Sequence, residues 1–123
     1  MYFLVVDDSP VMRDILIRIL KQAGYAEAAF AEAGNGLEAL RCMRDAKPDL
    51  MFLDWNMPDF NGIELAEKLQ LAGIKVKFGF VTIETSEEIR RRALNTGALF
   101  VISKPFTPEA MIEAIGQAGL VAI

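Results

Sequence analysis

Five polar side chains stand directly after short apolar runs of the sequence, and their types could support chemistry if they meet: Asp7, Asp8, Asp54, Thr82 and Lys104. Three carboxylates brought together repel one another, because two unit charges about 4 Å apart cost roughly 4 kcal/mol at an effective dielectric constant of 20. A lysine offsets one charge, and a hard divalent cation offsets more. Oxygen ligands without histidine or cysteine favour Mg²⁺, Mn²⁺ or Ca²⁺ over zinc, and a site with few protein oxygens fits Mg²⁺ best.

These side chains meet only if the apolar runs are neighbouring strands of one sheet. Four runs are continuously apolar, which is typical of strands that helices cover on both faces. A fifth run, at residues 28–31, is rich in alanine and is a weaker prediction. In chain order, the predicted strands cover residues 3–6, 28–31, 50–53, 78–81 and 99–102.

Amphipathic stretches with helix start and stop signals separate the runs. Ser9 and Pro10 predict the start of the first helix and Gly24 its end, while Thr85 and Glu88 form a capping-box pattern. The later helices are expected at residues 37–45, 61–72, 86–94 and 108–118. Alternating strands and helices predict an α/β fold with a doubly wound parallel sheet, whose strands gather functional loops at their carboxyl ends.

Length and composition indicate one domain with a large core: 123 residues, 53% hydrophobic and 24% charged. The net charge of −4 argues against nucleic-acid binding, and no apolar run approaches the ~20 residues of a membrane span, so no membrane insertion is expected. A single cysteine, Cys42, and the lack of a secretory signal favour the cytoplasm. The absence of histidine excludes imidazole zinc sites, Ser-His-Asp triads and histidine proton shuttles.

Several motifs of this sequence resemble those of the receiver domain of two-component response regulators. The resemblance is strongest to the stand-alone chemotaxis regulators of the CheY type. The similar residues are Val5-Val6-Asp7-Asp8-Ser9, Leu53-Asp54-Trp55-Asn56-Met57-Pro58 with Gly62, then Thr82, and Lys104-Pro105-Phe106. The resemblance covers essentially the whole chain. It implies a five-stranded sheet in the order 2-1-3-4-5, and residues 1–123 as one receiver domain with no output domain.

The resemblance also implies roles for the acids. Asp54 is the implied phosphoacceptor, and Asp7 and Asp8 hold Mg²⁺ together with Asp54 and the backbone carbonyl of Asn56, with Mn²⁺ as a substitute. Trp55 follows the phosphoacceptor, so we expect it near the metal. The chain is then not an enzyme in the usual sense, because it catalyses only its own phosphorylation and slow autodephosphorylation.

The remaining polar residues and the partners follow from the same resemblance. Thr82 and Lys104 bind phosphoryl oxygens, and the Lys104–Pro105 bond is cis. A histidine kinase or a phosphotransfer protein donates the phosphoryl group, since this chain has no histidine of its own. Phosphorylation then biases the face built from residues 86–118, where a downstream protein docks. A monomer or weak dimer is expected.

Two positions depart from the family pattern. The family has Tyr or Phe three residues before the lysine, where this chain has Val101. Phe100 cannot substitute for it, because adjacent residues of a strand point to opposite faces; we interpret Phe100 as a core residue. The residue after Thr82 is usually small, but here it is Ile83. Its side chain is expected to restrict access to the phosphoryl group and to slow hydrolysis.

These departures leave one alternative function open. The chain would then be a phosphorylation-independent interaction module that keeps the receiver fold and its acids but signals in another way.

A second alternative rests on Gly34-Asn35-Gly36-Leu37-Glu38-Ala39, which matches a dinucleotide-binding fingerprint, with Asp54 at the spacing of a ribose-binding acid. It leaves Asp7, Asp8 and Lys104 unexplained. We therefore interpret the glycines as turn formers ahead of a helix.

The run Arg90-Arg91-Arg92 is interpreted as a solvated helix face. Glu87 with Arg91, and Glu88 with Arg92, have the spacing of favourable ion pairs on one helix.

Overall fold

The computed structural model describes residues 1–57, 62–83 and 86–120. Its strands are β1 (Tyr2–Val6), β2 (Ala29–Ala33), β3 (Leu50–Asp54), β4 (Phe78–Thr82) and β5 (Val101–Ser103). Its helices are α1 (Pro10–Leu20), the π-helical turn η1 (Lys21–Tyr25), α2 (Gly36–Asp45), α3 (Gly62–Leu71), α4 (Glu87–Asn95) and α5 (Pro108–Gln117). Within these described segments, no helix combines the length and the apolar character that crossing a membrane requires.

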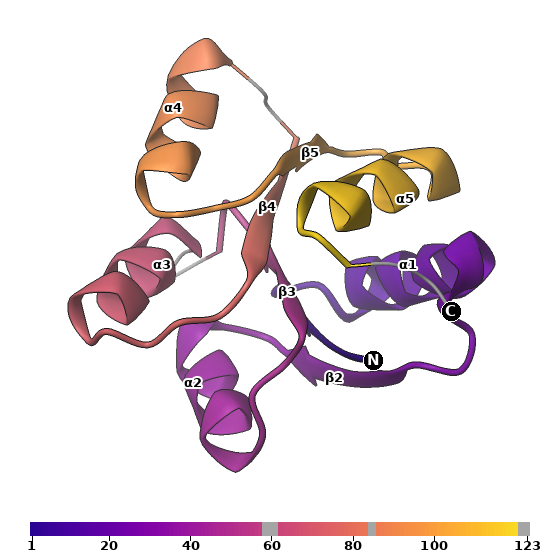
Figure 1. Ribbon diagram of the computed structural model, residues 1–123, viewed down its shortest axis with the longest axis horizontal. Helices are drawn as coiled ribbons and strands as arrows, with labels where there is room; N and C mark the ends of the chain where they lie inside the picture. The colour runs from indigo at the N-terminus through magenta and orange to yellow at the C-terminus, as the bar shows by residue number, and fades with distance from the viewer. Residues whose placement is uncertain (58–61, 84–85, 121–123) are drawn as a thin grey trace.

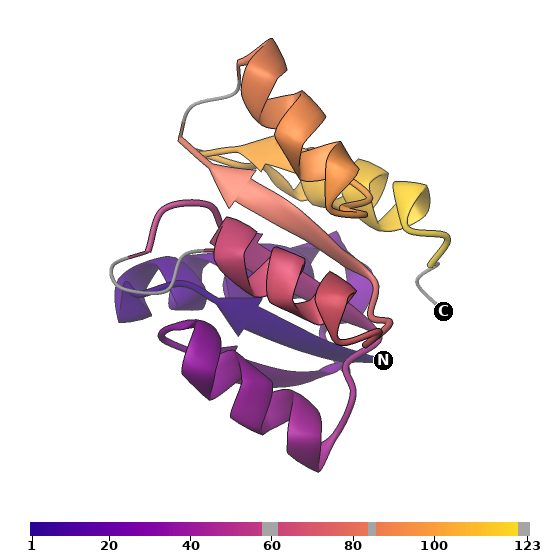
Figure 2. The same cartoon turned by 90° about the vertical axis from the view of Figure 1, so that its left-hand side faces the viewer.

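The strands form one parallel sheet in the order β2-β1-β3-β4-β5, which confirms the predicted doubly wound topology. In the sheet register, Val6 lies beside Leu53, Asp54 beside Val81, and Thr82 beside Ser103. Because neighbouring strands end at matching positions, their carboxyl ends form one edge of the sheet. Figure 2 shows the arrowheads of β1 and β4 pointing to this same end.

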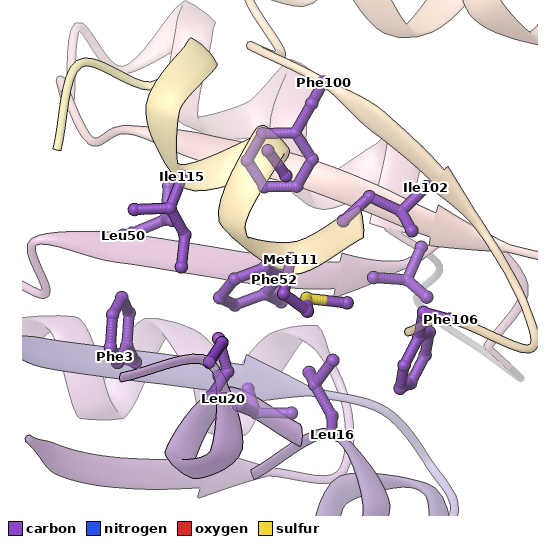
Figure 3. Close-up of a cluster of buried hydrophobic side chains, with 14 of the residues drawn as sticks. Phe3, Leu16, Leu20, Leu50, Phe52, Phe100, Ile102, Phe106, Met111 and Ile115 are labelled. Atoms are coloured by element: carbon purple, nitrogen blue, oxygen red, sulfur yellow. The ribbon is translucent and has the colours of Figure 1, made fainter. Parts of the chain in front are cut away.

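Helices cover both faces of the sheet, so the central strands are apolar on both sides until they reach the carboxyl edge of the sheet. Helices α1 and α5 lie on one face, and α2, α3 and α4 lie on the other (Figure 1). The first face buries a cluster that contains the rings of Phe3, Phe52 and Phe100, with Met111 of α5 beside Phe52 (Figure 3). The second face buries Leu53, Phe80 and the side chains of α3. This packing confirms the prediction that helices cover the strands on both faces, which explains why the apolar runs do not alternate with polar residues.

The strand bounds differ from the predicted ones by one residue in β1, β3 and β4 and by more in β2 and β5. The second strand covers Ala29–Ala33 rather than 28–31, and the fifth covers Val101–Ser103 rather than 99–102. In both cases the neighbouring strand decides: β2 pairs residue by residue with Tyr2–Val6 of β1, which draws the polar Glu32 into the strand. The pattern of apolar residues alone does not predict how β2 aligns with β1.

The helix ends also differ in part from the predictions. Ser9 caps α1 as predicted, with its hydroxyl accepting from the Met12 amide at 3.2 Å. Gly24 has the left-handed, non-helical backbone of a helix end, with a φ of 113°, as predicted, and the chain kinks there within η1. Ser86, not Thr85, caps α4, and Thr85 lies outside the described residues.

Phe100 is a core residue, as predicted, and its place in the core depends on Gly79. The Phe100 ring lies 5.6 Å from the Phe52 ring, whereas Val101 packs against the cluster on the opposite face. A Cβ atom on Gly79 would lie 2.1 Å from a carbon of the Phe100 ring. Glycine at position 79 therefore makes room for the aromatic ring.

We predict that Gly79→Ala destabilises the fold by about 1–3 kcal/mol, because the added methyl group overfills the core. Urea unfolding measures the change. Gly116→Ala is the matched control: no atom lies within 4 Å of its Cβ position, so it should be neutral or slightly stabilising. Adding Phe100→Leu to Gly79→Ala should cost less than the two single changes together. Additive costs would contradict the shared space.

Candidate functional site

The sheet edge brings together the acids that the sequence analysis singled out. Asp7 directly follows β1, Asp8 comes next in the chain, and Asp54 is the last residue of β3. One carboxylate oxygen from each of the three lies within 4.8 Å of the other two. Asp7 and Asp54 are buried, whereas Asp8 is exposed. The predicted cluster is therefore present, with one open side.

Lys104 supplies the cation that the acids need. Its ammonium group is 3.0 Å from Asp7 Oδ2 and 3.4 Å from Asp54 Oδ1, forming an ion pair with each. The Lys104 side chain is only 12% exposed, so water screens these ion pairs weakly. The Lys104–Pro105 peptide bond is cis, as the resemblance implied. Thr82, the last predicted member, is buried at the end of β4, next to β3.

The backbone around Asp7 holds its carboxylate in place. The Ser9 amide donates to Asp7 Oδ1 at 2.9 Å, and the Asp7 amide donates to the Ala33 carbonyl at 3.0 Å. With Lys104 on Oδ2, both carboxylate oxygens have a donor. The carbonyl oxygen of Asp7 accepts from the guanidinium of Arg13, a residue that the sequence analysis did not connect with the site.

Burial dominates the electrostatics of Asp54. Burial first, and then the charge of Asp7, raise the pKa of the Asp54 carboxyl, and the net value is about 6. Lys104 and the backbone amide of Asn56 lower this pKa without restoring the ordinary value. Burial also lowers the pKa of Lys104, but the carboxylates of Asp7 and Asp54 outweigh it, and the net shift is upward. The lysine therefore stays charged at neutral pH.

The donor set fits a hard divalent cation. The ligand atoms that Asp7, Asp8 and Asp54 offer are carboxylate oxygens, close enough to share one ion. When the three acids are ionised, their charge of −3 and the +1 of Lys104 leave −2, which one divalent cation balances. Oxygen donors of this kind are the ligands of Mg²⁺ and Mn²⁺.

Gly62, which the resemblance included without a role, allows α3 to begin next to the acid cluster. A Cβ atom there would lie 2.3 Å from the carbonyl oxygen of Asp54 and 3.1 Å from the Phe80 ring. Any side chain at Gly62 would push α3 away from the strand that carries Asp54.

Trp55 links the site to α4. Its ring is buried, 4.9 Å from the Phe80 ring and 5.6 Å from the guanidinium of Arg92, which lies over it. Arg92 thus makes a cation–π contact, and the expected ion pair with Glu88 is wrong. Neither that pair nor the one between Glu87 and Arg91 forms among the described residues.

The glycine motif at residues 34–39 is a helix start, as predicted. The Asn35 side chain caps α2 by accepting from the Glu38 amide at 2.9 Å. In return, the Glu38 carboxylate accepts from the Gly34 amide at 3.0 Å. Because Glu38 already uses this amide, the turn does not offer it to a pyrophosphate.

The two positions that depart from the family pattern lie near the strand ends. Ile83 follows Thr82, with 76% of its surface exposed. Val101 is half-buried at the start of β5, beside Phe80 in the register.

The raised pKa of Asp54 predicts a pH-dependent effect of Asp54→Asn. Its folded-state pKa of about 6 lies above the ordinary 3.8, so the fold gains stability from the protonated acid at low pH and loses it as pH rises through 6. In EDTA, the variant should exceed the wild type in stability by about 1–3 kcal/mol at pH 8 and approach it near pH 4. Chemical unfolding at both pH values measures this difference. Asp45→Asn, at an exposed position of α2, controls for the lost charge; an equal gap at both pH values would contradict the prediction.

Comparisons with known proteins agree with this geometry. The model of the response regulator receiver domain family matches residues 3–116. The chain is 33% identical over 114 residues to the chemotaxis protein CheY of Thermotoga maritima, with 93% of each chain covered. It is 35% identical over 119 residues to CheY1 of Helicobacter pylori, with 94% of each covered.

Solved structures show the same likeness. The chemotaxis protein CheY4 of Vibrio cholerae superposes with a TM-score of 0.83 at 28% identity, covering 95% of this chain and 97% of that one. The parallel sheet, the acid cluster at its edge and these relatives together show that the chain belongs to the response regulator receiver domain family of two-component systems, with CheY-like chemotaxis regulators among its relatives.

Proposed function

We propose that the chain is a phosphoacceptor that carries its phosphoryl group on Asp54. The observation that carries this proposal is the pairing of a buried carboxylate, Asp54, with Lys104 inside a cluster of three acids. An Asp54 oxygen attacks phosphorus, a P–O bond to the carboxylate forms, and the bond to the donor breaks. The donor nitrogen or oxygen leaves with the electron pair and takes a proton from solvent. The product is an acyl phosphate.

The proposed Mg²⁺ ligands are Asp7, Asp8 and Asp54, together with the backbone carbonyl of Asn56, and Mn²⁺ is the proposed substitute. When bound, the cation neutralises charge on the attacking and transferred oxygens, so the acids stop opposing the reaction. Asp7 and Asp8 hold it beside the nucleophile. The chain has little covalent chemistry of its own to supply, because phosphoryl transfer depends mainly on positioning and charge.

Lys104 and Thr82 receive the transferred group. Lys104 already lies 3.4 Å from an Asp54 oxygen, so its ammonium can pair with a phosphoryl oxygen without a large movement. Thr82 ends the next strand and donates its hydroxyl to another oxygen. The phosphoryl group adds roughly −1.5 to −2 charges, which draws Thr82 and the start of the following segment towards it.

A histidine kinase or phosphotransfer protein is the proposed donor, and a downstream protein on the 86–118 face is the proposed receiver of the signal. A groove of about 470 Å³ lies on this face, between α4, β5 and α5. Its lining includes Arg90 of α4, Val101 of β5 and Glu113 of α5. A change at Thr82 reaches the face through β4 and the neighbouring β5. We propose that the protein acts in the cytoplasm. We also propose that it catalyses only its own phosphorylation and slow autodephosphorylation.

Acetyl phosphate or beryllofluoride should modify the protein only when Mg²⁺ is present. With acetyl phosphate we expect an acyl phosphate of the wild type in the mass spectrum, and with either reagent a change in the emission of Trp55, the single tryptophan of the chain. Asp54→Asn should lose both signals, while Asp45→Asn keeps them. An adduct that persists in Asp54→Asn would contradict the assignment. Failure of the wild type to react would favour a phosphorylation-independent interaction module.

Ile83→Ala should shorten the lifetime of the acyl phosphate. A bulky side chain next to Thr82 restricts the approach of water to phosphorus, so its removal should speed hydrolysis roughly 2- to 10-fold, at most about 1.4 kcal/mol of barrier. The decay of radiolabelled protein measures the rate. Leu71→Ala, an exposed leucine at the end of α3, is the control for loss of an aliphatic side chain. Equal decay of Ile83→Ala and wild type would exclude the steric explanation.

A further inference from the structure

We propose that Arg13 is a positioning residue for the metal-binding acids, acting through the peptide group between Asp7 and Asp8. This inference rests on the proposed function, because it assumes that these acids hold Mg²⁺. Arg13 lies on α1, and its guanidinium donates to the carbonyl oxygen of Asp7 rather than to the carboxylate of Asp7. It therefore leaves both Asp7 carboxylate oxygens to Ser9 and Lys104.

The bond from Arg13 fixes the direction of Asp8. The Asp7 carbonyl belongs to the peptide that joins the two acids, so its orientation sets the rotation of Asp8 relative to Asp7. Asp7 is held by further contacts, whereas the Asp8 carboxylate makes no hydrogen bond or ion pair with the described residues. The backbone is then what aims Asp8 into the cluster, and Arg13 holds that backbone.

Arg13 is itself held rigidly enough to do this. Its Nε is 3.0 Å from Glu32 Oε1 on β2, and its side chain is only 16% exposed. Its own backbone amide donates to the Ser9 carbonyl at 3.1 Å. Arg13 therefore contacts the three-residue connection 7–9 at both ends and ties it to the edge strand of the sheet.

Positioning and simple charge predict opposite effects of Arg13 on metal affinity. A guanidinium close to a cation site repels Mg²⁺, so removing its charge alone would tighten binding. Removing a group that orients the ligands loosens binding, as changes behind metal ligands do by about 10- to 100-fold. The sign of the change in affinity therefore distinguishes the two roles.

The test is a titration of the unphosphorylated protein with MgCl₂, in which calorimetry and the emission of Trp55 measure the Kd for Mg²⁺. Arg13→Met should raise the Kd for Mg²⁺ about 10-fold. Arg18→Met is the matched control, since Arg18 lies on the same helix with 72% of its side chain exposed and pairs with Asp14. Its Kd should equal that of the wild type.

Two results for Arg13→Met would overturn the proposal. An unchanged Kd with a lower melting temperature would show a purely structural role, and a lower Kd would show charge repulsion alone. If Arg13→Met fails to fold, Glu32→Ala replaces it, because it removes the oxygen that holds Nε. A Kd raised about 3-fold is then expected, and an unchanged Kd overturns the proposal.

The same experiment separates this inference from the proposed function. If the wild type binds Mg²⁺ and forms the acyl phosphate while Arg13→Met matches it, only the role of Arg13 is lost. If the wild type itself does not bind Mg²⁺, the proposed function and the role of Arg13 both fail.

Discussion

The repulsion between three carboxylates at one sheet edge is the constraint on which the site depends. Lys104 opposes it directly by pairing with Asp7 and Asp54, at 3.0 and 3.4 Å. One ammonium cannot balance three acids, and the pKa of Asp54 rises to about 6 as a result of its burial and of this crowding. Lys104 alone therefore leaves the three acids only partly balanced, and a divalent cation at the proposed site would offset the remaining negative charge.

The convergence of these groups could be predicted from the sequence because it depends on topology. Parallel strands linked by helices all end at the same edge, so residues that follow apolar runs become neighbours whatever their separation in the chain. Asp7 and Lys104, 97 positions apart, form an ion pair for this reason. The Ser9 cap could also be predicted from the sequence, and Asn35 lies within a turn that was predicted. A helix cap depends only on residues within one helical turn.

The contacts of long side chains could not be predicted in the same way. Arg92 has the spacing to pair with Glu88, but the nearby face of Trp55 holds it instead, because β3 and α4 meet only in the folded chain. Arg13 reaches back over the turn to Asp7 and across to Glu32 of β2, which no helical pattern contains. The strand bounds of β2 likewise come from its register with β1. Helical periodicity gives the exposed side of a helix but not the direction in which an arginine extends.

The space shared by Gly79 and Phe100 constrains how relatives of this chain can diverge. The two positions should covary: a side chain at 79 requires a small residue at 100, and an aromatic residue at 100 requires glycine at 79. Adding a side chain at position 79 first overfills the core, and shortening the residue at position 100 first leaves a cavity. Moving the aromatic ring one position along, to 101, would transfer it to the opposite layer and leave a void over Gly79. Such an exchange therefore needs a compensating substitution on β4, which makes the present arrangement resistant to single-step change.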